Sequence, residues 1–180
     1  EATVRLMQDS GILPEGSLQL IIGSTGNLLD HLTEQDVVTF TGSAQTARLL
    51  KNHDNIMARS IPFNAEADSL NAAILAPDIN EDDAEFDLFI REVYKEMTTK
   101  VGQKCTAIRR IIVPKNKLPQ VIDKLIHKLA KVSYGDPVCE GVRMGALVSI
   151  DQLNDVKAKI AELSQNCELV YAQETKPQGI

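Results

Sequence analysis

The feature that most constrains the fold is an alternation of helical and strand-like segments in the first third of the chain. A helical pattern stops at Gly11, and an apolar strand-like run follows at 18–22. A short helix beginning at Asn27, a strand at 37–41 and a helix at 44–51 come next. Strands that alternate with helices in this way are typical of parallel sheets. The sequence therefore predicts an α/β fold.

The middle of the chain predicts a change of structural unit. Two extended runs, at 60–64 and 72–76, are separated by polar residues. An acidic stretch then opens a helix, where the helix dipole favours negative charge. A strand at 109–113 follows and ends at Pro114. The inner face of the helix is predicted from five apolar residues at helical spacing: Phe86, Phe89, Ile90, Val93 and Met97.

The last third predicts two amphipathic helices and one more strand. Apolar residues fall on one helical face from Leu118 to Val132. Ser149 and Gln152 have the spacing of a capping box ahead of a second helix. The run at 167–172 predicts the strand. The inner face of the second helix is predicted to carry Leu153, Val156, Ile160 and Leu163.

The composition argues against several classes of function. The 180 residues carry a net charge of −6, which argues against broad binding to a nucleic-acid backbone. No apolar run approaches the roughly 18 residues that span a bilayer, so we expect no membrane partner. The three cysteines and three histidines are scattered without metal-ligand spacing, so we expect no metal site and no disulfide framework. Reduced cysteines are typical of a cytoplasmic protein.

Cys105 is the candidate nucleophile. A lone cysteine is by default a small buried side chain, and that interpretation stays open from the residue alone. A thiolate forms near neutral pH only with help from its surroundings. Gly102 permits a close backbone approach, while Lys104, Arg109 and Arg110 add positive charge nearby in sequence. These neighbours favour a reactive thiol.

Glu66 is the candidate general base, and a solvated loop carboxylate is the alternative interpretation. A carboxylate that activates water is a common catalytic base. Asp68 is a rival two residues on. If the segment is extended, Asp68 would point to the same side as Glu66.

Gly42 and Ser43 form a candidate anion site. A strand that ends in Gly-Ser and turns directly into a helix presents free backbone N–H groups and a hydroxyl to a ligand. An ordinary turn in which Ser43 caps the helix is the equally weighted alternative. A second glycine pair, Gly23 and Gly26, is too short to be a dinucleotide fingerprint.

Taken in order, these segments resemble the aldehyde dehydrogenase superfamily. "ILPEGSLQLIIG" resembles a turn and strand of its cofactor domain, and "VVTFTGS" resembles its Phe-Thr-Gly-Ser motif. Glu66 falls at the Glu of the Glu-Leu-Gly-Gly-Lys motif, although "EADSLN" replaces the glycine-rich sequence. "GQKCTAIRRIIVP" resembles the Gly-Gln-x-Cys segment, and "YGDPVCEGVRMGALVS" resembles the Gly-Asp-Pro run beyond it. The resemblance covers nearly the whole chain.

Within the superfamily, three segments narrow the resemblance. "FNAEADSLN", "REVYKEMTTKVGQKCTAIRRIIVP" and "GVRMGALVS" are similar to the dehydrogenase half of the bifunctional ring-opening enzymes of phenylacetate degradation. In those enzymes a hotdog-fold hydratase domain opens an oxepin-CoA ring. The dehydrogenase half then oxidises the CoA-linked semialdehyde with NADP.

The resemblance implies a mechanism. The Cys105 thiolate would attack the aldehyde. A hydride would then pass to NADP, with NAD also possible, and leave a thioester on Cys105. Glu66 would activate water to hydrolyse that thioester. The backbone N–H of Cys105 would be one oxyanion donor. Arg110 would be structural. The residues implied beside the cofactor are Gly23, Thr41, Gly42 and Ser43.

The resemblance also implies a domain organisation. Residues 1–60 would be the C-terminal part of the cofactor-binding domain, and 61–180 the N-terminal part of the catalytic domain. The chain would be an inactive fragment of a longer, homo-oligomeric protein that acts on a CoA-linked aldehyde. Two alternatives remain: an acylating, CoA-dependent aldehyde dehydrogenase, which needs no base at Glu66, and a non-catalytic α/β interaction module with an inert Cys105.

Overall fold

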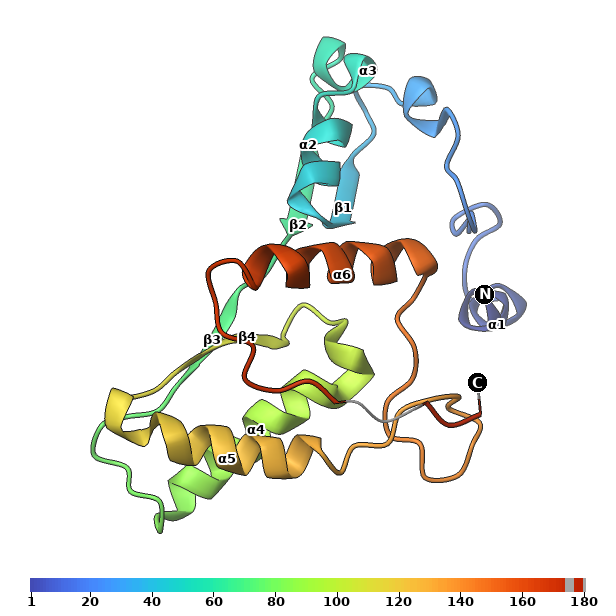
Figure 1. Cartoon of the computed structure of the whole chain (residues 1–180). Helices are drawn as coiled ribbons and strands as arrows, with labels where there is room; N and C mark the ends of the chain where they lie inside the picture. Colours follow the sequence, from blue (N-terminus) through green and yellow to red (C-terminus); the bar gives the residue numbers. More distant parts are fainter. Residues whose placement is uncertain (174–176, 180) are drawn as a thin grey trace. The chain divides into compact units, whose positions relative to one another are not determined.

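The computed structural model describes residues 1–173 and 177–179. It divides the chain into two compact units, Glu1–Asp68 and Ser69–Ile180, and each is described by itself (Figure 1). The predicted division into a cofactor-binding part, 1–60, and a catalytic part, 61–180, stays a prediction.

A pair of parallel strands forms the centre of the first unit. Strand β1 (Val38–Gly42) pairs with β2 (Phe63–Ala67), and the chain between them forms helices α2 (Ala44–Lys51) and α3 (Asp54–Ala58). Helix α2 packs against both strands, which buries Ala47. The predicted helix at 44–51 and the parallel character of the strands are therefore confirmed, but the partner of β1 overlaps the extended run that the sequence assigns to the next unit.

The segment before β1 begins with helix α1 (Ala2–Asp9) and a short 3-10 helix, η1 (Leu28–His31). Gly11 follows α1 with a positive φ of 67°, as expected for a residue that stops a helix. The predicted strand at 18–22 is wrong: this run forms no strand, and its Ile22 is 69% exposed. A strand needs a partner, and no strand of the described chain pairs with these residues.

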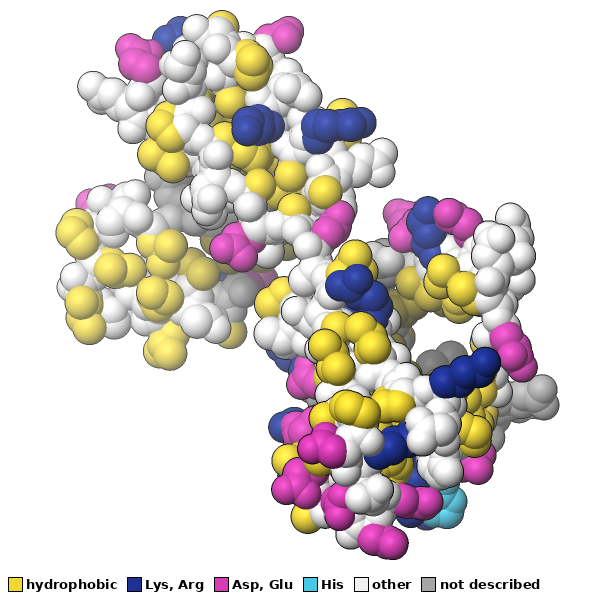
Figure 2. All heavy atoms as spheres, turned by 90° about the vertical axis from the view of Figure 1, so that its left-hand side faces the viewer, with side chains coloured by type: hydrophobic (Ala, Val, Ile, Leu, Met, Phe, Trp, Pro, Cys, Tyr) yellow, Lys and Arg dark blue, Asp and Glu magenta, His cyan; other side chains and the backbone are white. Residues whose placement is uncertain are grey.

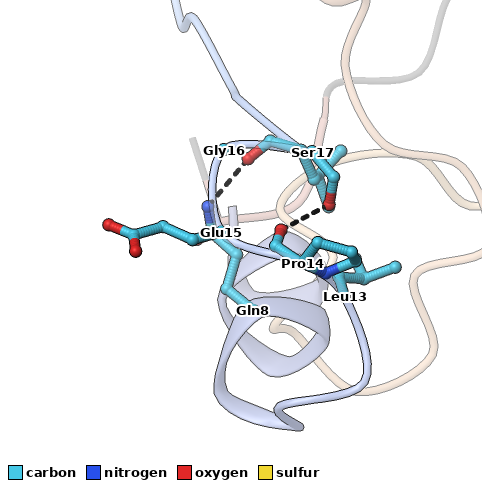
Figure 3. A pocket seen from close by; sticks show the side chains of 7 residues that line it. Gln8, Leu13, Pro14, Glu15, Gly16 and Ser17 are labelled. Carbon is cyan, nitrogen blue, oxygen red and sulfur yellow. Dashed lines mark hydrogen bonds between the residues drawn. The ribbon is translucent and has the colours of Figure 1, made fainter.

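A turn between α1 and η1 surrounds a shallow pocket of about 300 Å³ (Figure 3). Gln8 Nε2 donates to the Leu18 carbonyl at 3.0 Å, so the helix holds the far side of the turn. Ser17 Oγ donates to the Pro14 carbonyl at 2.7 Å and closes the turn itself. The pocket is thus the inside of a tight turn.

The second unit contains the larger core. Strand β3 (Asn71–Ile74) pairs in parallel with β4 (Ile108–Ile112), and helix α4 (Ala84–Thr98) connects them through the 3-10 helix η2 (Thr99–Gly102). Helix α5 (Leu118–Leu129), which follows the 3-10 helix η3 (Lys115–Lys117), lies beside α4 (Figure 1). The buried cluster consists of Leu75, Phe86, Ile90, Val93, Val121 and Leu125.

Helix α6 (Ile150–Leu163) begins as predicted but is not packed as predicted. Ser149 Oγ accepts from the Gln152 N–H at 3.1 Å, which is one half of the capping box. No residue of α6 is buried, and Ile160 and Leu163 are 50% and 62% exposed. The inner-face prediction is therefore wrong for these two residues. Periodicity identifies an apolar face, but it does not supply the surface that covers it.

The predicted strand at 167–172 is also wrong. Residues 167–172 form no strand, and Leu169 and Val170 are 64% and 50% exposed.

Exposed apolar side chains lie between charged ones on the face shown in Figure 2. Among the described residues, no helix combines the length and apolar character needed to cross a membrane.

Candidate active site

The loop before Cys105 has an unusual backbone. Lys100, Val101 and Gly102 are three successive residues with left-handed φ values of 53°, 58° and 68°. Glycine adopts this conformation freely, but a β-branched valine is a genuine outlier there. Such strained segments persist only where the surrounding structure holds them, and they gather at functional sites.

Arg109 holds this left-handed turn. In the β3–β4 pairing, Asn71 lies opposite Ile108 and Ala72 opposite Arg110, so Arg109 is the extra residue of a bulge. A bulge redirects the side chain it carries. Arg109 Nη2 donates to the Gly102 carbonyl at 2.8 Å.

The other two nearby cations also have fixed partners. Lys104 Nζ lies 2.8 Å from Glu96 Oε1, and both side chains are about four-fifths buried, at 19% and 20% exposure. Arg110 Nη2 donates to the Leu70 carbonyl at 2.6 Å, which agrees with the structural role expected for Arg110. The positive charges that the sequence places near Cys105 thus also brace the loop.

Cys105 itself is exposed, so the interpretation of a buried core thiol is wrong. Its carbonyl oxygen accepts from Ser69 Oγ and from Asn71 Nδ2, the latter at 2.6 Å. Within the described chain, the backbone N–H groups of Cys105 and Thr106 donate to no acceptor. The loop therefore offers an exposed thiol beside two free N–H donors, which is the arrangement that an oxyanion site requires.

Val101 connects this loop to an apolar pocket. The pocket has a volume of about 520 Å³, and its lining includes Met144, Leu147 and Leu153. Gln103 links the loop to the same region, because its Oε1 accepts from the Val148 N–H at 2.9 Å.

Glu66 lies on strand β2 and is exposed, so it is not the loop carboxylate of the alternative interpretation. It lies directly opposite Thr41 of β1 in the parallel register. Across the described residues, its carboxylate has no hydrogen-bond or ion-pair partner. The structure thus brings together one predicted catalytic residue and one predicted cofactor residue.

An extended segment would place the Asp68 side chain on the same side as Glu66. Asp68 instead lies just beyond the end of β2. It has a φ of +43°, so the extended segment ends before it. Its Oδ2 accepts from the Ala44 N–H at 3.1 Å, at the start of α2. Asp68 therefore places a carboxylate at the helix N-terminus.

The turn from β1 into α2 is capped as an ordinary strand-to-helix turn. Ser43 Oγ accepts from the Thr46 N–H at 3.1 Å, while the N–H of Gln45 has no acceptor in the described part of the chain. A Cβ on Gly42 would lie 2.5 Å from the Phe40 ring, so a larger residue there would displace that ring. The N-cap interpretation of Ser43 is confirmed.

Among the described residues, Gly23 makes no hydrogen bond to this turn. It has a φ of +103°, and nothing approaches within 4 Å of the position that its Cβ would take.

The described residues contain no cluster of three or more metal-ligating side chains.

A family model described as "Aldehyde dehydrogenase family" matches residues 1–179. The chain belongs to the aldehyde dehydrogenase family. This confirms the family predicted from the ordered motifs.

A relative from Aromatoleum evansii, named 3,4-dehydroadipyl-CoA semialdehyde dehydrogenase, is 48% identical over 163 residues, which are 91% of this chain and 32% of that protein. The alpha-ketoglutaric semialdehyde dehydrogenase of Bacillus subtilis is 30% identical over 85% of this chain and 30% of its own length.

Solved structures show the same fold. A mutant of Bradyrhizobium japonicum proline utilization A superposes with a TM-score of 0.82 at 24% identity, over 99% of this chain and 18% of that one. A mutant of aldehyde dehydrogenase C from Pseudomonas syringae, complexed with NAD+ and octanal, has a TM-score of 0.68 at 26% identity, over 80% of this chain and 28% of that one. The α/β aldehyde dehydrogenase fold is therefore confirmed. The chain spans about a third of the length of the curated relatives it matches.

Sequence reasoning missed the contacts that three residues of the candidate site make: Asp68, Ser69 and Asn71. All three lie where the family's glycine-rich motif is replaced by "DSLN". That replacement was the available signal, because polar side chains in place of glycine bring new hydrogen-bonding groups. Their hydrogen-bond partners are distant in sequence, so the sequence alone did not identify these contacts.

Proposed function

We propose that this chain carries the nucleophile and the general base of an NAD(P)-dependent semialdehyde dehydrogenase. The observation that carries the proposal is the Cys105 loop, which combines an exposed thiol with two free backbone N–H donors in an aldehyde dehydrogenase family member. The whole protein would oxidise a CoA-linked semialdehyde to its carboxylic acid.

The substrate class is supported by a relative. The Aromatoleum evansii protein, at 48% identity, is named for a CoA-linked semialdehyde. The similarity of the segments around Glu66 and Cys105 to the phenylacetate ring-opening enzymes supports a place in phenylacetate catabolism. We propose a cytoplasmic homo-oligomer for the whole protein, by analogy with the family.

The proposed reaction proceeds through covalent intermediates on Cys105. The thiolate attacks the aldehyde carbon and forms a thiohemiacetal, whose oxyanion accepts from the Cys105 N–H. When bound, a nicotinamide cofactor accepts the hydride that leaves this carbon. The product of that step is a thioester on Cys105. Glu66 removes a proton from water, which attacks the thioester and releases the acid and the thiolate.

The β1–α2 turn fits a cofactor with exposed polar groups. Thr41 offers a hydroxyl, and Gln45 offers a free backbone N–H at the start of α2. The Ser43 hydroxyl already donates to Thr46 Oγ1 at 2.9 Å. Because the Asp68 carboxylate and the Ser43 hydroxyl already have partners, we assign cofactor contacts to Thr41 and Gln45, with NADP as the proposed cofactor.

The test compares cysteine variants of the longer parent protein. Cys105→Ser is expected to abolish NADPH formation from a CoA-linked semialdehyde, because an alcohol is a far weaker nucleophile than a thiolate. Cys167→Ser is the matched control, since Cys167 is also an exposed free thiol. Full activity in Cys105→Ser would overturn the proposed role of Cys105 as the nucleophile.

We further propose that the 180-residue chain is inactive by itself, because about two thirds of its relatives' length has no counterpart in it. The measurement is NADP+ and NAD+ reduction with a simple aldehyde. Turnover by the isolated chain above that of its Cys105→Ser variant would contradict this.

A further inference from the structure

The segment that follows the predicted base also holds the backbone of the predicted nucleophile. Ser69 Oγ and Asn71 Nδ2 both donate to the Cys105 carbonyl oxygen. Asn71 Nδ2 also lies 3.3 Å from the Ala107 carbonyl, so one amide spans the residues on both sides of Thr106. Ser69 follows Glu66 by three residues in sequence.

These contacts are more specific than general loop packing. One carbonyl oxygen with two side-chain donors is fully occupied, because a carbonyl has two acceptor positions. Two backbone N–H groups of the same turn have no acceptor in the described chain. They belong to Cys105 and Thr106. The loop is therefore fixed through its carbonyl, and its N–H groups are left free.

We propose that Ser69 and Asn71 are positioning residues for Cys105: they fix the direction of the Cys105 carbonyl and leave the N–H groups of Cys105 and Thr106 available to the substrate oxygen. This inference rests on the proposed nucleophilic role of Cys105. Side chains that lock a reacting residue in its productive geometry commonly decide whether a site works.

The electrostatic consequence has a definite sign. A carbonyl oxygen carries partial negative charge and destabilises a thiolate beside it. Two donors on the Cys105 oxygen offset that charge and fix its direction. Removal of a donor therefore leaves more of that negative charge facing the sulfur and lets the peptide turn, and both changes slow the reaction of Cys105 with an electrophile.

The experiment measures thiol reactivity in the chain itself. The chain is treated with iodoacetamide at pH 7 under native conditions, and the alkylation rates of Cys105 and Cys167 are followed in the same sample by peptide mass spectrometry. The ratio of the two rates is the readout. Both thiols are exposed, so Cys167 corrects for reagent and for exposure. Cys139, which is half-buried, provides a check that the second unit stays folded.

Ser69→Ala and Asn71→Ala are each expected to lower this ratio by about threefold, the effect of one hydrogen bond of modest strength. Ser69→Thr keeps the hydroxyl and is expected to restore the wild-type ratio. Asn154→Ala, which changes an exposed asparagine of α6, is the matched control and is expected to leave the ratio unchanged.

Asn71 also begins β3, so the mild Ser69→Ala variant keeps the test valid if Asn71→Ala does not fold. A role in stability alone would lower the melting temperature and leave the ratio unchanged, and this would overturn the inference. An increased ratio, or a failure of Ser69→Thr to restore it, would do the same. A lowered ratio in a chain whose Cys105 reacts no faster than free cysteine would uphold the positioning and count against the proposed function.

Discussion

Glu66 lies directly opposite Thr41 in the parallel pairing of β2 with β1. Residues paired in this way project to the same face of the sheet. Both side chains are exposed, so that face presents the predicted base next to a hydroxyl of the predicted cofactor turn. The proposed base and a proposed cofactor contact thus share one surface of the first unit.

Thr41→Val is predicted to weaken cofactor binding in the parent protein. The change keeps the shape of the side chain and removes its hydroxyl, so the KM for NADP should rise by about threefold to tenfold, the effect of one lost hydrogen bond. Thr39→Val is the control, because Thr39 lies on the same face of β1, one pleat away and opposite Asn64. Equal effects of the two variants on KM would show that Thr41 has no special role.

Ser43→Ala is predicted to destabilise the first unit. Ser43 Oγ accepts from the Thr46 N–H, and loss of such an N-cap lowers the free energy of unfolding by about 1 kcal/mol. Urea unfolding followed by circular dichroism measures this change. Gln45→Ala, on the same exposed turn, should change the free energy of unfolding by much less. A neutral Ser43→Ala would show that Asp68 alone caps the helix.

Lys100→Gly is predicted to stabilise the second unit. Lys100 is exposed and has a φ of +53°, a conformation that glycine adopts without steric penalty. Relief of this strain should raise the free energy of unfolding by up to about 1 kcal/mol. Lys157→Gly is the opposite control. Lys157 lies inside α6, where glycine lowers helix stability by about 1 kcal/mol. If both variants are destabilising, the left-handed turn is not strained.

Protonation of Asp36 at low pH is predicted to break its hydrogen bonds with Thr33. The Thr33 N–H and hydroxyl donate to Asp36 Oδ2 at 2.7 and 2.8 Å. The backbone hydrogen bond, followed by the hydroxyl bond, lowers the pKa of Asp36 below its ordinary value of 3.8. Because the folded-state pKa is the lower one, this contact stabilises the folded chain above the ordinary value and is lost as pH falls through the folded-state pKa.

The amide proton shift of Thr33, followed against pH by nuclear magnetic resonance, reports this titration. Its midpoint should lie below 3.8, and Asp36→Asn should remove the transition. A midpoint at or above 3.8 would contradict the assigned hydrogen bonds.

Local signals in the sequence were sufficient where a structural element depends on its own residues. The helix at 44–51 was predicted with its exact bounds, because Ser43 is a strong N-cap and the strand before it ends in glycine. The family was predicted from motifs whose order is specific. Strand pairing depends on a partner, and for this reason the apolar runs at 18–22 and 167–172 were mistaken for strands.

The architecture of the candidate site was less accessible to prediction. Asn71 and Cys105 are 34 residues apart, and only the pairing of β3 with β4 brings them together. An extended segment would place Asp68 on the same side as Glu66, yet its positive φ ends the strand and its carboxylate contacts the start of α2. Side-chain hydrogen bonds between distant segments follow from the tertiary fold, and no local pattern encodes them.

The central claim is that Cys105 forms the covalent intermediate and Glu66 resolves it. The most direct measurement uses the Glu66→Gln variant of the parent protein, mixed with NADP+ and a CoA-linked semialdehyde and quenched with acid for mass spectrometry. We predict that an acyl group accumulates on the peptide that contains Cys105, because water is no longer activated to remove it. An acyl group on Cys139 or Cys167, or unchanged turnover with no acyl group on Cys105, would contradict the claim.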